Sequence, residues 1–239
     1  MTLKSEIDDI VSHLPSGWHT TNWQSSRTDV PDPDAMGYSE GKNLDATFLY
    51  ADMVDSSGLV AAAGKEVVAT VIASYLNACV KVIRAHQGEI RSFDGDRVMG
   101  VFAGPGKETR AVIAGLKINY VVNQVLDPGI QRMYSEISRS GWHLRHVTGM
   151  ATGPTLMVRA GIKYNSDLVS IGAGPNLAAK LSDIRDGRYS TIIGAGTYRN
   201  LERRAIVGSD EQNMWTGPCS IGMGNRSYNY YKSNYHWEV

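Results

Sequence analysis

The chain has 239 residues, 42% of them hydrophobic, and its 24 Lys and Arg balance its 24 Asp and Glu, so the formal net charge is zero. This length can bury one sizeable core, which predicts one main domain. A balanced charge provides no basic field for a nucleic-acid backbone or an anionic membrane surface, so neither is expected as a partner.

The N-terminal residues and the cysteines bear on where the protein resides. Residues 1–14 contain three acids and no apolar block behind a basic region, which predicts a short amphipathic helix and not a signal peptide. No window approaches the run of about 18 apolar residues that a membrane-spanning helix needs. Because Cys79 lies in an apolar helical pattern, we expect it and Cys219 to be buried, reduced thiols in a cytoplasmic protein.

The first predicted elements are an arm, a strand and a helix. Residues 16–42 are rich in Ser, Pro, Asp and Gly, which predicts a linker or an arm laid over the surface. We therefore divide the chain into a helix and arm at 1–42 and a main domain at 43–239. Residues 44–53 (LDATFLYADM) are predicted to form a buried strand, and a helical pattern follows over residues 55–85.

The rest of the chain mixes predicted strands and helices. Residues 89–102 form two β-prone runs joined by Asp94-Gly95, a strong hairpin signal. Helical periodicity over 107–138 is interrupted by Asp127-Pro128-Gly129, which predicts two helices. Further predictions are two or three strands at 144–170, a helix at 176–185, a strand at 190–193, a helix at 197–203 and a strand or hairpin at 227–239. Without a regular βαβ rhythm, this order favours an α+β fold with a mostly antiparallel sheet flanked by helices.

Asp52 stands at the end of the apolar strand, directly before a helix start. A carboxylate buried there costs several kcal/mol unless it is paired or bound to a metal. Asp55, Ser56 and Ser57 already supply helix-capping groups, which leaves Asp52 free for another role. The backbone N–H groups of Val54 to Ser57 would suit a polyphosphate, since a helix N-terminus attracts anions.

A second acid, Asp96, begins the second strand of the predicted hairpin. Asp94 needs no function beyond the turn. If the two strands lie side by side, Asp52 and Asp96 converge at one sheet edge, the arrangement that holds two hard cations on oxygen ligands.

Two further pairs carry weaker signals. Asn176 and Lys180 share a helical face at i and i+4, and a capping Asn beside a solvated Lys is the ordinary interpretation. His143 and His146 lack a third ligand at zinc spacing, so we predict surface or hydrogen-bonded histidines.

Three segments together resemble the catalytic domain of class III adenylate and guanylate cyclases. They are a first metal-binding strand with its phosphate loop, a second metal-binding hairpin and a transition-state segment, here FLYADMVDSS, FDGDRVMGVF and VRAGIKYNSDLVSIGAGPNLAAKL. The resemblance covers residues 44 to about 200, roughly two thirds of the chain. It implies a ferredoxin-like, palm-type fold for residues 43–239, and a nucleoside triphosphate as substrate.

The resemblance also assigns roles. Asp52 and Asp96 would bind two divalent cations, Mg²⁺ or Mn²⁺, with the Met53 carbonyl as a further ligand. Asn176 would orient the ribose. Lys180 stands where the family usually has Arg, and it keeps the charge but not the planar fork that steadies the α-phosphate.

The family's active sites are shared between two chains, so the resemblance implies a homodimer. Asp52 and Asp96 of one chain would face Asn176 and Lys180 of the other. The substrate-contacting positions that the resemblance adds are Tyr50, Val54, Asp55, Ser56, Ser57, Ser92, Arg97 and Val169.

The base-reading positions depart from the purine-specific pattern. Ser92 stands where those cyclases have Lys, and Val169 stands where they have Asp or Thr. Tyr50 lies on the same strand face as Asp52, where its ring either narrows the pocket or only packs in the core. A smaller base is favoured, as in the uridylate and cytidylate cyclases of bacterial Pycsar antiphage systems, which the NSDLVSIG stretch and the YYKSNYHW ending also resemble. Such enzymes make cyclic UMP or cyclic CMP from UTP or CTP, and a separate effector senses the product.

Two alternatives stay open. One is an adenylate or guanylate cyclase with altered base contacts, in which Asp167 reads the purine. The other is a degenerate domain that only dimerises or binds nucleotide, against which the presence of both Asp52 and Asp96 argues.

Overall fold

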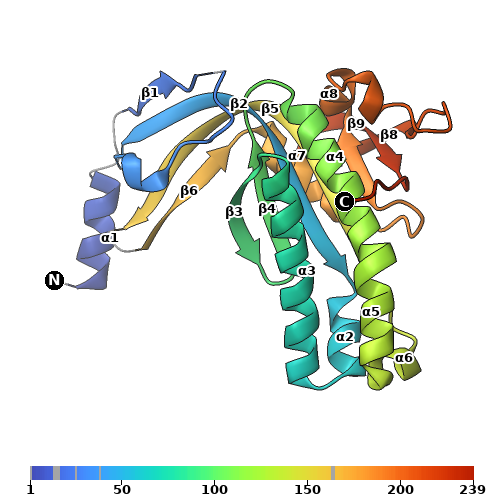
Figure 1. Ribbon diagram of the computed structural model, residues 1–239. Coiled ribbons are helices and arrows are strands. Elements are labelled where there is room, and N and C mark those ends of the chain that lie inside the picture. Colours follow the sequence, from blue (N-terminus) through green and yellow to red (C-terminus); the bar gives the residue numbers. More distant parts are fainter. Residues whose placement is uncertain (1, 13–16, 25, 38, 163–164) are drawn as a thin grey trace.

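A single mixed sheet organises the computed structural model, which describes residues 2–12, 17–24, 26–37, 39–162 and 165–239 (Figure 1). Residues 1, 13 and 14 of the predicted helix, residues 16, 25 and 38 of the predicted arm, and residues 163 and 164 of the predicted strands lie outside the described residues. The strands are β1 (His19–Asn22), β2 (Glu40–Val54), β3 (Glu89–Asp94), β4 (Arg97–Phe102), β5 (Arg145–Ile162), β6 (Asn165–Ile171), β7 (Thr191–Gly194), β8 (Thr216–Met223) and β9 (Arg226–Ser233).

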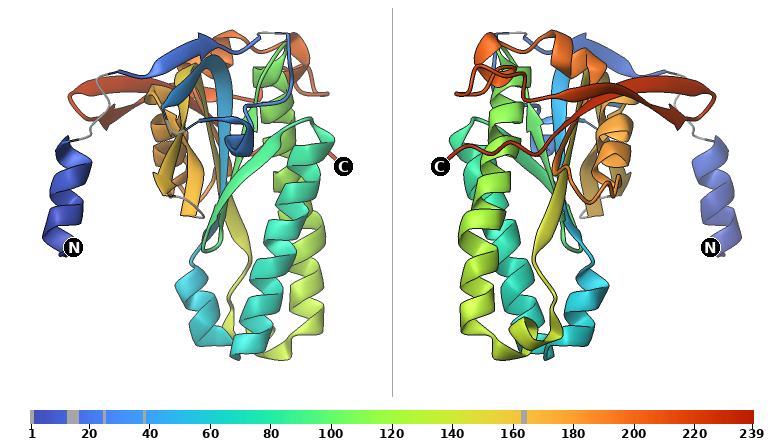
Figure 2. Two further views of the ribbon diagram at one scale, coloured as in Figure 1. Left: turned by 90° about the vertical axis from the view of Figure 1, so that its left-hand side faces the viewer. Right: turned by 90° about the vertical axis from the view of Figure 1, so that its right-hand side faces the viewer.

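Helices cover both faces of this sheet (Figure 2). They are α1 (Leu3–Ser12), α2 (Ser56–Ala62), α3 (Lys65–Ala85), α4 (Lys107–Tyr120), α5 (Asp127–Met133), α6 (Ser135–Ser140), α7 (Ala173–Ser182) and α8 (Ala195–Arg199), with a π-helical turn at Val121–Leu126 and 3-10 turns at Pro33–Ala35 and Arg203–Ala205.

The strand order is β3-β4-β2-β5-β7-β9-β8, with β1 added to β2 and β6 to β5. Neighbouring strands are antiparallel except for the parallel pairs β1 with β2 and β5 with β7. The predicted α+β fold with a mostly antiparallel, helix-flanked sheet is therefore confirmed.

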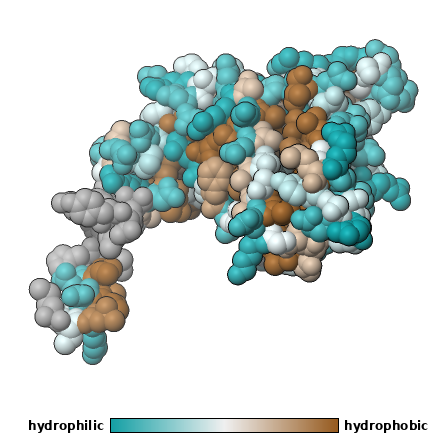
Figure 3. Space-filling view, turned by 60° about the horizontal axis from the view of Figure 1, so that its bottom comes forward, coloured by the Kyte–Doolittle hydropathy of each residue, from teal (hydrophilic) through white to brown (hydrophobic). Residues whose placement is uncertain are grey.

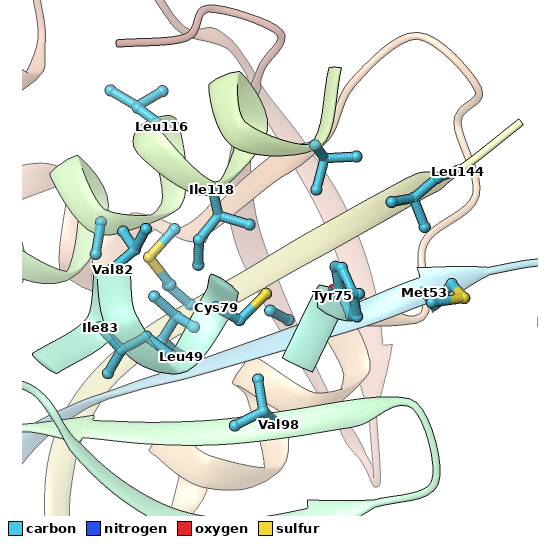
Figure 4. Close-up of a cluster of buried hydrophobic side chains, with 14 of the residues drawn as sticks. Leu49, Met53, Tyr75, Cys79, Val82, Ile83, Val98, Leu116, Ile118 and Leu144 are labelled. Carbon is cyan, nitrogen blue, oxygen red and sulfur yellow. The ribbon is translucent and has the colours of Figure 1, made fainter. Parts of the chain in front are cut away.

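The β2 strand divides the core into two. Its alternating side chains send Leu49 and Met53 toward α3 and α4, where they pack with Tyr75 and Cys79 (Figure 4). Tyr50 packs with the second cluster, on the α7 face. Each fully buried large apolar side chain contributes about 1.5–3 kcal/mol, so this alternation fixes the strand register.

The arm is more ordered than a surface linker. The central strand begins at Glu40, before the predicted start at residue 44, because Gly41 to Asn43 pair with both β1 and β5. Val30 and Met36 of the arm are also buried. Backbone hydrogen bonds and apolar contacts thus hold residues that composition alone assigns to a loop.

The helical pattern after β2 is two helices and not one. The predicted cap is confirmed, since the Asp55 carboxylate accepts a hydrogen bond of 3.1 Å from Gly58 N. Ala63 and Gly64 are extended and break the pattern before α3 begins. The expectation that no segment is apolar enough to span a membrane is wrong for α3, which could cross one by length and composition alone. Val71, Tyr75, Cys79 and Ile83 of α3 are nevertheless buried in the core.

Both cysteines are free thiols. Burial raises the pKa of Cys79 to about 12, as expected for an inert core thiol. Cys219 is only half-buried, so the prediction that both are buried is wrong for this one. It lies in β8, an edge strand that the sequence did not reveal because Gly217 and Pro218 interrupt its pattern.

The predicted interruption at Asp127-Pro128-Gly129 is wrong. The helical path runs from α4 through the π-helical turn into α5, and it changes direction only at Tyr134. The N–H of Asp127 donates to the Val122 carbonyl five residues back, and Pro128 then falls in the first turn of α5, where its missing N–H costs nothing.

The N-terminal helix α1 stands away from the sheet (Figure 2). Its apolar side chains gather on one side of the helix, which Figure 3 shows in brown, and they are exposed: Leu3, Ile7, Ile10 and Val11. The predicted amphipathic helix is confirmed.

Close packing of α7 on β5 generates a stability prediction. A Cβ on Gly149 would lie 2.2 Å from Ser182 N and 2.4 Å from the Ala178 carbonyl oxygen, whereas a Cβ on Gly153 meets nothing nearer than 3.8 Å. We expect Gly149→Ala to lower the free energy of unfolding by about 1–3 kcal/mol or more, since backbone must shift. Gly153→Ala, the matched control on the same strand, should be neutral or slightly stabilising. Equal urea-unfolding curves for the two variants would contradict this packing.

Candidate active site

Asp52 lies near the C-terminal end of β2 with only 14% of its side chain exposed. Burial raises the pKa of this carboxyl group, and a hydrogen bond from Arg185 opposes that effect. The Arg185 Nη2 atom is 2.6 Å from Asp52 Oδ2. The acid that the sequence singles out therefore lies at the rim of the core, where its ion pair with Arg185 and, to a smaller extent, the charge of Arg97 favour the carboxylate form.

Asp96 occupies the turn between β3 and β4 and is half-buried. Pairing of β2 with β4 puts Asp52 opposite Arg97, the residue after Asp96. The two carboxylates lie close enough that the charge of Asp96 contributes to the raised pKa of Asp52. They meet at one sheet edge, as the hairpin predicts.

The donor set at this edge suits a hard divalent cation. Asp52 and Asp96 would supply carboxylate oxygens to such an ion, and Met53, whose side chain is buried among apolar residues, could offer only its backbone carbonyl. Among the described residues no group of three or more His, Cys, Asp or Glu gathers at a metal-binding distance. Two carboxylates fit ions that also keep water and substrate phosphate oxygens as ligands, as Mg²⁺ does.

Arg97 is engaged with neighbours on two sides. Its guanidinium lies 5.4 Å from the centre of the Tyr50 ring, and it pairs with Asp94 at 3.0 Å and Asp183 at 3.7 Å. These contacts tie the hairpin to the end of α7. Tyr50 is half-buried in the α7-side cluster, so the core-packing role expected for it is confirmed, and burial raises the pKa of its hydroxyl.

A cavity of about 570 Å³ opens beside Val54 and Asp55. Three arginines line it, namely Arg145, Arg185 and Arg188. Arg145 is paired with Val54 across the β2–β5 ladder. In the described part of the chain, neither Arg145 nor Arg188 has an ion-pair partner. The cavity therefore has an excess of positive charge next to the paired carboxylates, as a polyphosphate requires. We call it the arginine cavity.

Sequence reasoning missed these arginines, although one signal was available. Residues 144–147 open a strand antiparallel to β2, so the first side chains of that strand must lie beside the last ones of β2. The arginines at 185 and 188 come from the loop between α7 and β7, whose position depends on the packing of α7 and has no local signature.

The two histidines differ. His143 is exposed, and its Nδ1 atom lies 2.9 Å from Asp127 Oδ2, so the prediction of a surface or hydrogen-bonded histidine is confirmed for this residue. His146 lines the arginine cavity but is 3% exposed, and neither ring nitrogen has a hydrogen-bond partner among the described residues. Burial lowers its pKa to about 3, so the ring is neutral near pH 7. The prediction of a surface or hydrogen-bonded His146 is wrong, because β5 pairs it with the buried Met53 of β2 and so places its ring in the core.

Asn176 and Lys180 are exposed on α7 and line a separate, shallow pocket of about 490 Å³, together with Asp183 and Ile221. No residue lines both this pocket and the arginine cavity. Ile184 lines the pocket and the next residue, Arg185, lines the arginine cavity, so the two adjoin along the loop after α7. Within one chain, the carboxylates and the Asn–Lys pair do not share a cavity.

The remaining predicted positions are spread over the sheet. Ser56 and Ser57 begin α2, a short helix in which the Asp55 carboxylate caps the N–H of Gly58. Ser92 is half-buried on β3 beside the hairpin turn. Val169 is 43% exposed on β6 and pairs with β5 at Val158, far along that strand from the end that pairs with Asp52.

Comparison with known proteins gives consistent relatives. A uridylate cyclase from Rhodovulum sp. (strain MB263) is 36% identical over 216 residues, 88% of each chain, and a uridylate cyclase from Xanthomonas perforans is 31% identical over 242 residues that span both chains completely. A guanylyl cyclase crystal structure superposes with a TM-score of 0.66 at 19% identity, over 83% of this chain and 95% of that one. No protein-family model matches the chain. Identity above 30% over nearly the whole length, together with a shared fold, shows that the chain is a nucleotidyl cyclase of class III and belongs to the family of the bacterial uridylate cyclases.

Proposed function

We propose that this enzyme closes UTP, or CTP, into the 3′,5′-cyclic monophosphate with release of pyrophosphate. The observation that carries the proposal is the convergence of Asp52 and Asp96 beside the arginine cavity. Uridine is favoured because the relatives are uridylate cyclases. A cytoplasmic enzyme of this kind would make a second messenger for bacterial antiphage defence, which a separate effector senses.

Asp52, Asp96 and the Met53 carbonyl would hold two divalent cations, Mg²⁺ or Mn²⁺. Bound there, the cations would activate the ribose 3′-hydroxyl and neutralise the phosphates. Arg185 stabilises the Asp52 carboxylate in the free chain, so cation binding competes with this ion pair. Arg145 and Arg188 would bind the β- and γ-phosphates, and the loop from Val54 to Ser57 would border them.

Asn176 and Lys180 would act on the site of the partner chain in a homodimer. Their exposure and their separation from the arginine cavity support this division, since a second copy would have to supply the missing half of each site. In that site Asn176 would orient the ribose, and Lys180 would steady the charge on the α-phosphate.

The base would be read without the two polar groups of purine cyclases, with Ser92 and Val169 at those positions. Tyr50, held beneath Arg97, would limit the room for a larger ring. Asp167, the alternative purine reader, is exposed and accepts a hydrogen bond of 2.7 Å from Leu168 N, which occupies one of its oxygens.

The carboxylate assignment predicts severe loss of turnover in Asp52→Asn and in Asp96→Asn. Each change removes a metal-binding charge, and the rate of cyclic nucleotide formation should fall at least about a hundredfold, more than supporting residues around metal sites typically cost. Asp94→Asn is the matched control, because this acid is exposed in the same turn. Circular dichroism and urea unfolding establish that each variant is folded. Near-wild-type turnover in either Asp52→Asn or Asp96→Asn would refute the two-metal site.

Shared sites predict complementation between two inactive variants. Mixed Asp96→Asn and Lys180→Ala chains should recover about a quarter of the wild-type rate after random exchange, because half the dimers then hold one intact site of two. The rate is measured after exchange of differently tagged subunits has been demonstrated. Absence of activity despite that exchange would mean that each site is built within one chain.

The base-reading hypothesis predicts that two substitutions change the preference of the enzyme between purine and pyrimidine triphosphates. Ser92→Lys combined with Val169→Asp rebuilds the purine-reading groups, which would be buried without partners when a pyrimidine binds. The purine-to-pyrimidine ratio of kcat/KM should rise about ten- to hundredfold, measured with ATP, GTP, UTP and CTP on equally folded proteins. An unchanged ratio would mean that the base is read elsewhere.

A further inference from the structure

A second cavity, of about 720 Å³, is lined by Ala85 and His86 at the end of α3. In Figure 1 this is the end of α3 that points away from α2. Its walls come from four segments: the end of α3, the outer face of α4, residues 204–209 and the C-terminal tail. The basic and aromatic side chains of its lining include His86, Arg110, Lys117, Arg204, Tyr235 and Trp237. We call it the α3–α4 cavity.

Positive charge converges inside this cavity. Burial lowers the pKa of His86, and the charges of Lys117, Arg110 and Arg204 lower it further, in that order. All three cations thus act on one imidazole, although the chain as a whole is neutral.

Acids nearby offset only part of that charge, and one of them, Asp210, accepts a hydrogen bond of 2.8 Å from the Tyr235 hydroxyl. Glu238 lines the cavity but is exposed, and Glu202 pairs with Arg204 at 2.8 Å outside it. Glu108, whose charge reaches Arg110, already pairs with Lys107 at 3.2 Å. Lys117 has no ion-pair partner among the residues that the structure describes.

Arg110 is held rigidly by backbone carbonyls and not by an acid. Its Nη1 donates to the carbonyls of His86 at 3.3 Å and Gln87 at 3.1 Å, and its Nη2 donates to the carbonyl of Ala103. The Nε–H is buried without an acceptor among the described residues. The guanidinium is therefore preorganised, charged and still has a free donor.

The aromatic wall is equally fixed. Trp237 N donates to the Leu116 carbonyl on α4 at 3.2 Å, and the Asn119 amide donates to the carbonyls of Asn234 and Tyr235 at 3.2 and 2.9 Å. These bonds hold the tail against α4, so Tyr235 and Trp237 contribute ring surface beside the cations. The volume lies within the range of small-molecule sites.

We propose that the α3–α4 cavity binds a phosphate-bearing small molecule of nucleotide size, at a site separate from the catalytic centre. The cations would hold the phosphate, and the aromatic wall would contact the rest of the ligand. The phosphate group is the part of the ligand that the cations would recognise, so a nucleoside monophosphate and inorganic phosphate are both suitable probes.

The test is isothermal titration calorimetry without divalent cations, using UMP, inorganic phosphate and uridine. Each is titrated into wild-type protein and into Arg145→Ala, which removes a cation from the arginine cavity and so separates the two sites. Saturable UMP binding should persist in Arg145→Ala, inorganic phosphate should bind more weakly, and uridine should not bind. Lys117→Glu should weaken UMP binding at least about tenfold, since it reverses a charge in the wall.

Lys81→Glu is the matched control, because Lys81 is exposed on α3 and does not line the cavity. Arg204→Ala repeats the test if Lys117→Glu does not fold. Loss of UMP binding in Arg145→Ala, or equal affinities in Lys117→Glu and Lys81→Glu, would overturn the proposal. Equal affinity for inorganic phosphate and UMP would overturn the assignment of nucleotide size. No arm measures turnover, so the result is independent of the proposed reaction.

Discussion

The pairing of β2 with two neighbours at once is the constraint on which the site depends. Thr47 to Asp52 pair with β4, and Gly41 to Val54 pair with β5. This double register brings the hairpin turn with Asp96 to one side of Asp52 and Arg145 to the other. A slip of one residue would turn Tyr50 and Asp52 toward α3 and α4 and bury a carboxylate among apolar side chains. The same contacts that form the core therefore also aim the acids.

Charge at the end of β2 is balanced locally. A carboxylate that is largely buried needs a partner, and Arg185 provides it from the loop after α7. That loop also carries Arg188, so the segment that stabilises Asp52 delivers cationic groups to the arginine cavity. Acidic and basic halves of the proposed substrate site thus depend on each other, which explains why acids at this edge are tolerated in the folded chain.

The two faces of the sheet differ in what covers them and in what they present to solvent. The face under α3 and α4 is filled by apolar side chains such as Leu49 and Tyr75, and the α3–α4 cavity lies beyond this helical layer. The other face carries α7, whose outer side presents Asn176 and Lys180 to solvent. A dimer formed through that side would leave the α3–α4 cavity accessible, which is consistent with a separate ligand there.

The sequence by itself determined the class of fold and three local features, because short-range periodicity and turn chemistry encode them. These features are the strand before Asp52, the Asp94-Gly95 hairpin, and the helical face that Asn176 and Lys180 share. The sequence misplaced the helix break at Pro128, because a π-helical turn, in which the N–H of Asp127 bonds to the carbonyl five residues back, leads into α5. The proline then lies in the first turn of α5, where a helix accommodates it. The arginine cavity, the burial of His146 and the pairing of the arm with β2 were decided only by the tertiary structure. Each of them joins segments far apart in the chain, and which groups meet there depends on sheet register and helix packing, which no local pattern records.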